Sequence, residues 1–277
     1  RFHQDYPTLR LIDMILDNSV AGLINLNLVE RQAVRAAGCF PQSYNDHGAH
    51  YLYGIPKDGQ SMEEVENLLL DQVELVKKGE FADWILPAVL NDFKKTQKEN
   101  LESNPKRVEL LRDSFLSFVE WEVMDQEIQV LEKVTKEDVV RVANKYFGED
   151  YVVGFRMDQQ HVLPSIEKPK IDPLEIDPDK QSAFMKEVEE IPFNPFEPDF
   201  IESGKDFVSK EIAEGVTLVH VSNPLNDLFG IEVRMGIGSE HEPMLPYLKR
   251  MLSRSGAGEI SSEDLKIEWY KLATDFG

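Results

Sequence analysis

A stretch rich in proline and acidic residues, over about residues 161–207, most constrains how this chain can fold. Seven of the fifteen prolines lie between Pro164 and Pro198. Proline lacks a backbone donor and fixes φ, so this stretch can form neither a long helix nor a central strand. We therefore expect the chain to divide into a first domain, a linker and the start of another domain, over residues 1–158, 159–204 and 205–277.

Two elements are expected inside the linker. With Asp177 as N-cap and Pro178 in the first turn, residues 180–190 have the apolar spacing of a short helix. The next segment, residues 191–198, alternates prolines with apolar side chains, which suits an extended strap laid over a surface groove. A disordered acidic linker is the alternative. We favour the ordered strap because its apolar side chains would otherwise face water.

Composition bears on the class of function. The chain has 51 acidic and 30 basic residues, a formal net charge of −21, so we expect no nucleic-acid partner. No apolar run reaches the length of about 18 residues that a membrane span needs, so none is predicted. Cys39 is the single cysteine, which rules out an internal disulfide. The sequence begins at Arg1 without a signal peptide and stops at a helix end, so we expect an internal piece of a longer protein.

The part before the linker alternates between helical and strand patterns. The expected elements are helices over 5–16 and 23–32, strands over 34–44 and 50–55, helices over 61–78, 82–103, 105–124 and 135–146, and a closing strand over 151–157. Ser61 with Glu64 can form a capping box, and Thr135 with Asp138 can cap another helix. This order predicts an α+β fold with helices packed on one face of an antiparallel sheet.

Candidate chemistry in this first part is sparse. His47 and His50 form an H-x-x-H pair at a turn-to-strand junction, but no third ligand follows at metal spacing. We therefore expect a turn histidine and a strand histidine rather than a metal site. Glu120 and Glu122 are expected to face solvent. No Gly-rich phosphate loop, nucleophile elbow or Cys/His pair is recognised, so no catalytic and no metal-binding residue is predicted here.

The part after the linker begins with a strand-rich pattern. The expected elements are strands over 208–212, 216–221 and 228–236, a turn over 236–243, a helix over 244–254 and a further helix opened by Ser261. A strand leading into Gly238-Ser-Glu-His-Glu-Pro243, then a helix, a Gly-containing loop and the Ser261-capped helix, resembles the pitrilysin/insulinase family of zinc metallopeptidases.

In that family the helix carries an inverted His-x-x-Glu-His motif. Its two imidazoles bind zinc, and its glutamate acts as general base on the metal-bound water. Aligning the turn, with Met251 and Leu252 on the apolar pair after the motif, places Pro246 and Arg250 at the histidine positions. Lys249 then stands at the glutamate position. The resemblance implies a degenerate counterpart of the catalytic domain, with no zinc ligand and no catalytic residue in this chain.

Two further segments carry the resemblance in the first part of the chain. Residues 28–38 are similar to a helix-to-strand passage of the family, and residues 134–146 resemble the helix that precedes its last strand. The resemblance implies that residues 1–158 correspond to the second domain of a two-domain half. The region from residue 205 would then begin a third domain that lacks zinc.

The resemblance implies a zinc-dependent metalloendopeptidase that degrades peptides. This segment would supply a wall of the substrate chamber and a linker, and would be inactive alone. Its partners would be peptide substrates and the remaining domains of the same polypeptide, and zinc would belong to the longer protein. If acidic side chains line the chamber, their field would favour basic peptides. The alternative is a non-catalytic scaffold or partner subunit of the same fold without zinc.

Overall fold

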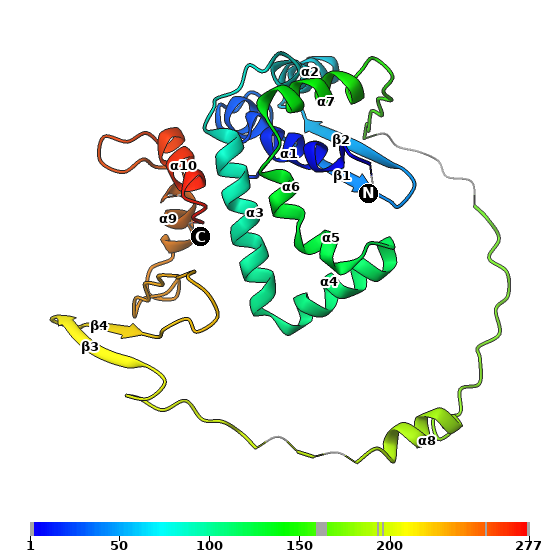
Figure 1. Ribbon diagram of the computed structural model, residues 1–277, viewed down its shortest axis with the longest axis vertical. Coiled ribbons are helices and arrows are strands. Elements are labelled where there is room, and N and C mark those ends of the chain that lie inside the picture. Colours follow the sequence, from blue (N-terminus) through cyan, green and yellow to red (C-terminus); the bar gives the residue numbers. More distant parts are fainter. Residues whose placement is uncertain (1–2, 159–164, 193, 196, 253, 276–277) are drawn as a thin grey trace. The chain divides into compact units, whose positions relative to one another are not determined.

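The computed structural model describes residues 3–158, 165–192, 194–195, 197–252 and 254–275 (Figure 1). The chain forms two compact units. Arg1–Phe155 together with Leu225–Gly277 make the first unit, and Arg156–Pro224 make the second. The division into domains at residues 158 and 204 stays a prediction.

The first unit combines helices with one antiparallel hairpin. Its helices are α1 (Tyr6–Leu16), the π-helix η1 (Asn25–Glu30), α2 (Met62–Lys78), α3 (Ile85–Glu102), α4 (Asn104–Ser117), α5 (Trp121–Asp125), α6 (Glu127–Leu131), α7 (Lys136–Tyr146), α9 (Leu245–Leu252) and α10 (Ser262–Lys271). Its strands are β1 (Ala36–Ser43) and β2 (Gly48–Ile55). Within the described ranges, no helix has both the length and the apolar content needed to cross a bilayer.

Helix α1 lies at the centre of the core of the first unit. Pro7 occupies its first turn, where the fixed φ suits a helix and the missing N–H leaves no bond unmade. One face of α1 is at most 1% exposed and consists of Leu11, Ile12, Ile15 and Leu16. Helices α2, α3, α6 and α7 and strand β1 all contact α1 (Figure 1). Its apolar stripe therefore joins elements that are far apart in sequence.

The β1–β2 hairpin has one covered face and one exposed face. Its strands are antiparallel, with Cys39 opposite Leu52 and Phe40 opposite Tyr51. The face that carries Cys39 packs on α1 and α2, whereas Phe40, Tyr51 and Tyr53 on the other face are 44–49% exposed. The predicted fold class, α+β with helices on one face of an antiparallel sheet, is confirmed.

The predicted capping residues stabilise the starts of α2 and α7. The Glu64 amide donates to Ser61 Oγ (3.1 Å), and the Ser61 amide donates to Glu64 Oε2 (2.9 Å). The Asp138 amide donates likewise to Thr135 Oγ1 (3.2 Å). Gly79 ends α2 with φ at 71°, a left-handed conformation that costs glycine little. These local signals set the helix ends as the sequence predicts.

Two predicted helices differ from the observed ones. The helix expected over 105–124 stops at Ser117, because Phe118 adopts a left-handed conformation with φ at 55°. The Val119 amide then donates to the Ser114 carbonyl (3.0 Å), which is the bonding of a helix C-terminus, and α5 starts separately. No glycine signals this stop. The helix expected over 23–32 begins at residue 23 as predicted, but residues 25–30 form a π-helix and the helix ends there.

The second unit contains α8 (Ala183–Glu189) and a hairpin of β3 (Val208–Ala213) and β4 (Val216–His220). The hairpin lies where the sequence predicts it, and Gly215 has φ at 72° in its turn. Helix α8 begins later than expected. Its N-cap is Ser182, whose Oγ accepts from the Met185 amide (3.1 Å), so the prediction of Asp177 as N-cap is wrong.

Only part of the predicted strap over residues 191–198 lies within the described residues. Ile191 is 64% exposed, and Phe200 just beyond the strap is 75% exposed. Phe193 and Phe196 lie outside the described residues. The expectation of an ordered strap over a surface groove stays a prediction.

The two predicted strands over 151–157 and 228–236 are wrong, because within the described residues neither segment pairs with another strand. Val152 is 98% exposed and Phe229 is 88% exposed. An alternating apolar pattern favours a strand only where a neighbouring strand takes up its backbone donors and acceptors. The pattern alone could not supply that neighbour.

We expect Ile15→Ala in α1 to lower the free energy of unfolding by about 2–5 kcal/mol, because it leaves a cavity among fully buried side chains. The matched control is Leu111→Ala in α4, where the side chain is 56% exposed and the loss should be below about 1 kcal/mol. Urea unfolding of both variants measures the difference. Equal losses would contradict the central position of α1.

Candidate functional site

The structure places the three degenerate-motif positions on helix α9. Pro246 is the second residue of this helix, and Lys249 and Arg250 follow one turn later. His241 lies upstream in the turn, and its Nδ1 accepts from the Gly238 amide (3.3 Å). The imidazole therefore stabilises the turn that leads into α9. The assignment of the three positions as counterparts of a zinc motif stays a prediction.

The chemistry of these three residue types does not fit a zinc ion. Proline has no side-chain donor atom, and the side chains of Lys249 and Arg250 are cations at neutral pH. Zinc needs deprotonated thiolate, neutral imidazole or carboxylate ligands. No step of metal catalysis can therefore be assigned to Pro246, Lys249 or Arg250.

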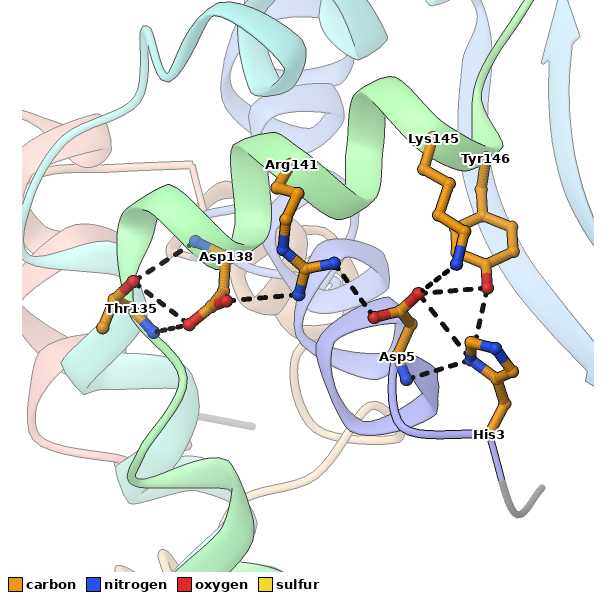
Figure 2. Close-up of polar contacts among 7 residues, drawn as sticks. All are labelled: His3, Asp5, Thr135, Asp138, Arg141, Lys145 and Tyr146. Atoms are coloured by element: carbon orange, nitrogen blue, oxygen red, sulfur yellow. Dashed lines mark hydrogen bonds and ion pairs between the residues drawn. The ribbon is translucent and has the colours of Figure 1, made fainter.

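A buried carboxylate, Asp5, organises a polar cluster in the first unit (Figure 2). Asp5 is 1% exposed and precedes α1. The Lys145 ammonium lies 2.7 Å from its Oδ2, the Arg141 guanidinium 3.1 Å from its Oδ1, and Tyr146 donates to Oδ2 at 3.2 Å. The Asp5 amide donates to His3 Nδ1 (3.1 Å). Arg141 and Lys145 reach Asp5 together because they are one turn apart on α7.

These donors keep Asp5 charged. The Lys145 hydrogen bond is the largest influence, burial opposes it, and Arg141 and Tyr146 add to it, so the pKa of Asp5 is lowered to about 2. The folded pKa thus lies below the unfolded value of about 3.9, so the charge stabilises the fold above about pH 4. That contribution is lost as the pH falls from about 4 to about 2. Asp5 is an ionised structural group at neutral pH, not a proton donor.

A second cluster joins Asp13 of α1, Cys39 of β1 and His50 of β2. Cys39 Sγ lies 3.4 Å from Asp13 Oδ1, and His50 Nε2 lies 3.1 Å from the same oxygen. The ligand atoms of all three side chains lie within 4.8 Å of one another. Among the described residues, this is the group of His, Cys, Asp and Glu side chains that could hold a metal ion.

The sequence pattern missed this cluster because its members come from three separate elements. His50 was paired with His47 by spacing, but His47 precedes β2 and its ring lies against Tyr44, 5.2 Å between centroids. The predicted hairpin could have indicated that Cys39 and His50 lie close together. Cys39 pairs with Leu52 and Pro41 with His50, so Cys39 and His50 are diagonal neighbours on one face.

Comparison with known proteins gives one family match. Residues 2–92 match the Peptidase M16 inactive domain. No curated protein sequence matched the chain. Among solved structures, a protease from Helicobacter pylori is similar with a TM-score of 0.50 and 21% identity, over 53% of this chain and 36% of that one. The inactive peptidase domain of a candidate zinc protease from Bordetella parapertussis has a TM-score of 0.46 and 17% identity, over 53% and 80%.

The family match lies in about the first third of the chain and there confirms the resemblance that the sequence predicts. At 21% identity, the likeness to the Helicobacter pylori protease shows the fold alone. This chain spans about a third of the length of that protease.

We expect Asp5→Asn to lower the free energy of unfolding at pH 7 by about 1–2 kcal/mol, a value reduced from the full pKa shift because Lys145 and Arg141 are half exposed. The difference in free energy of unfolding between the native chain and the variant should decrease as the pH falls from about 4 to about 2. Urea unfolding across this pH range measures it, with Asp71→Asn on the exposed side of α2 as control. A gap that does not change with pH would show that the Asp5 charge contributes nothing.

Proposed function

We propose that this chain, whose residues 2–92 belong to the inactive domain of peptidase family M16, forms a non-catalytic wall and linker of the substrate chamber of a zinc-dependent metalloendopeptidase. The match to an inactive domain carries the proposal. The unsuitable donor chemistry of Pro246, Lys249 and Arg250 supports it, because a catalytic counterpart would need zinc ligands on that helix.

In this proposal, zinc and the catalytic glutamate belong to another domain of a longer polypeptide. Zinc would polarise the peptide carbonyl and activate a water molecule there. The present chain would contribute surface rather than reacting groups. Its net charge of −21 supports a preference for basic peptides, since an acidic wall raises the local concentration of cationic ligands.

A scaffold role is the second candidate. The matched family describes an inactive domain, and a fold that lacks catalytic groups can serve as a partner subunit as well as a chamber wall. The two candidates differ in whether the longer protein cleaves peptides. In both, the isolated chain has no peptidase activity.

The proposal is tested by peptide binding and cleavage with the 277-residue chain. We expect a fluorescent basic peptide to bind more tightly than an acidic peptide of equal length, because the net charge is strongly negative, and added salt should weaken this preference. Fluorescence anisotropy measures binding, and a quenched version of the same peptide reports cleavage, with and without added Zn²⁺. No turnover is expected in either condition.

Turnover by this chain alone would overturn the assignment as an inactive domain. Equal binding of basic and acidic peptides would remove the electrostatic part of the proposal. If the longer protein cleaves no peptide in the presence of Zn²⁺, the scaffold role replaces the chamber wall.

A further inference from the structure

We propose that Asp13, Cys39 and His50 bind one Zn²⁺ ion, which ties α1 to the β1–β2 hairpin. The site is separate from α9 and does not depend on the proposed peptidase role. The sequence pattern predicts no metal ligand in residues 1–277, because such a pattern reveals only ligands that lie close together along the sequence. The proposed site differs from that prediction. Here the fold, rather than a short motif, brings the three donors together.

The spacing of the donor atoms is close to that of a zinc site. Zinc bonds of about 2.0–2.3 Å at tetrahedral angles place neighbouring ligand atoms about 3.3–3.8 Å apart. Cys39 Sγ is 3.4 Å and His50 Nε2 is 3.1 Å from Asp13 Oδ1, and the third separation is within 4.8 Å. We infer that side-chain rotation brings all three atoms to tetrahedral separations when an ion binds.

The imidazole of His50 lacks a hydrogen bond where a ligand would lie. Its Nε2 is buried and makes no hydrogen bond within the part of the chain that the structure describes, and Asp13 Oδ1, 3.1 Å away, is in ion-pair range only. Burial of a polar atom without a hydrogen bond is costly. A cation bound between His50 Nε2, the Asp13 carboxylate and the Cys39 sulfur would give Nε2 a partner. The close Nε2–Oδ1 contact would then be that of two ligands of one ion.

Zinc binding at this cluster would release a proton from Cys39. Without a metal ion, the Cys39 thiol donates a hydrogen bond to Asp13 Oδ1. When zinc binds, the Zn–S bond forms, the S–H bond breaks and one proton passes to solvent. Zinc affinity must therefore fall as the pH is lowered.

Neighbouring residues hold the ligands in position. Asp17, one turn after Asp13, accepts from the Cys39 amide with its Oδ2 (3.0 Å), and Asn25 donates to its Oδ1 (2.8 Å). Gly38 makes this approach possible, because an added Cβ would lie 2.5 Å from Asp17 Oδ2. The Phe147 ring packs edge-on against His50, 5.2 Å between centroids.

The donor set selects the metal. A thiolate with an imidazole and a carboxylate suits Zn²⁺ better than Mg²⁺ or Ca²⁺, which take oxygen ligands. Three protein ligands leave a fourth position for water. The side chains of Asp13 and His50 are each 15% exposed, so the cluster is close enough to solvent for an ion to enter.

Cobalt titration of the full 277-residue chain tests the site, because Co²⁺ replaces Zn²⁺ and a cysteine ligand gives a thiolate-to-cobalt absorption band. We expect one Co²⁺ per chain, the thiolate band, and loss of that band on addition of one equivalent of Zn²⁺. The strongly acidic surface binds divalent ions weakly. The thiolate band separates such binding from the proposed site.

Ligand variants give the second measurement. Cys39→Ser, His50→Gln and Asp13→Asn should each weaken zinc binding by more than about 100-fold, because loss of outer-shell partners alone weakens it by about 10–100-fold. Asp17→Asn, which acts through Cys39, should fall in that smaller range. His47→Ala is the matched control and should bind zinc like the native chain. Circular dichroism and thermal melting in EDTA show whether each variant folds.

Two outcomes would overturn the site. One is the absence of a thiolate band in the native chain, which depends on no variant. The other is unchanged zinc affinity in a folded Cys39→Ser or His50→Gln chain, which would leave an ordinary Asp13–His50 ion pair and a thiol hydrogen bond. Either result leaves the expectations for peptide binding and turnover untouched.

Discussion

Removal of one face of α1 from water is the interaction on which the first unit depends. Helices of 11 residues, such as α1 and α7, are marginal on their own in water, and so is an isolated two-stranded hairpin. Their stability comes from packing. Leu11, Ile12, Ile15 and Leu16 are covered by several elements at once. Each of those elements is therefore stabilised by packing on α1.

Polar groups at the two ends of α1 fix the positions of α7 and of the β1–β2 hairpin along it, which apolar contact alone would not fix. Asp5 binds α7 at the N-terminal end, and Asp13 with Asp17 holds the hairpin at the other end. Apolar contact supplies most of the stability but little direction, whereas hydrogen bonds to a buried carboxylate have strict geometry. The orientation of α7 and of the hairpin against α1 therefore rests on three aspartates.

Sequence reasoning succeeded where the cause of structure is local. The Ser61 and Thr135 caps, the β1–β2 pair and the fold class follow from neighbouring residues and their spacing. It failed where the cause is a distant partner. The segments over 151–157 and 228–236 have the strand pattern, but the described part of the chain offers them no strand to pair with. The Asp13–Cys39–His50 cluster exists only after the hairpin has folded onto α1.

The Asp5 cluster also determines the path of the polypeptide. His3 comes just before α1 and Tyr146 closes α7, yet their rings are 6.3 Å apart between centroids (Figure 2). The backbone therefore enters and leaves the α1–α7 layer at one corner. At that corner His3 and Tyr146 are joined twice: directly, with 3.3 Å between Tyr146 Oη and His3 Nδ1, and through Asp5, which bonds to both.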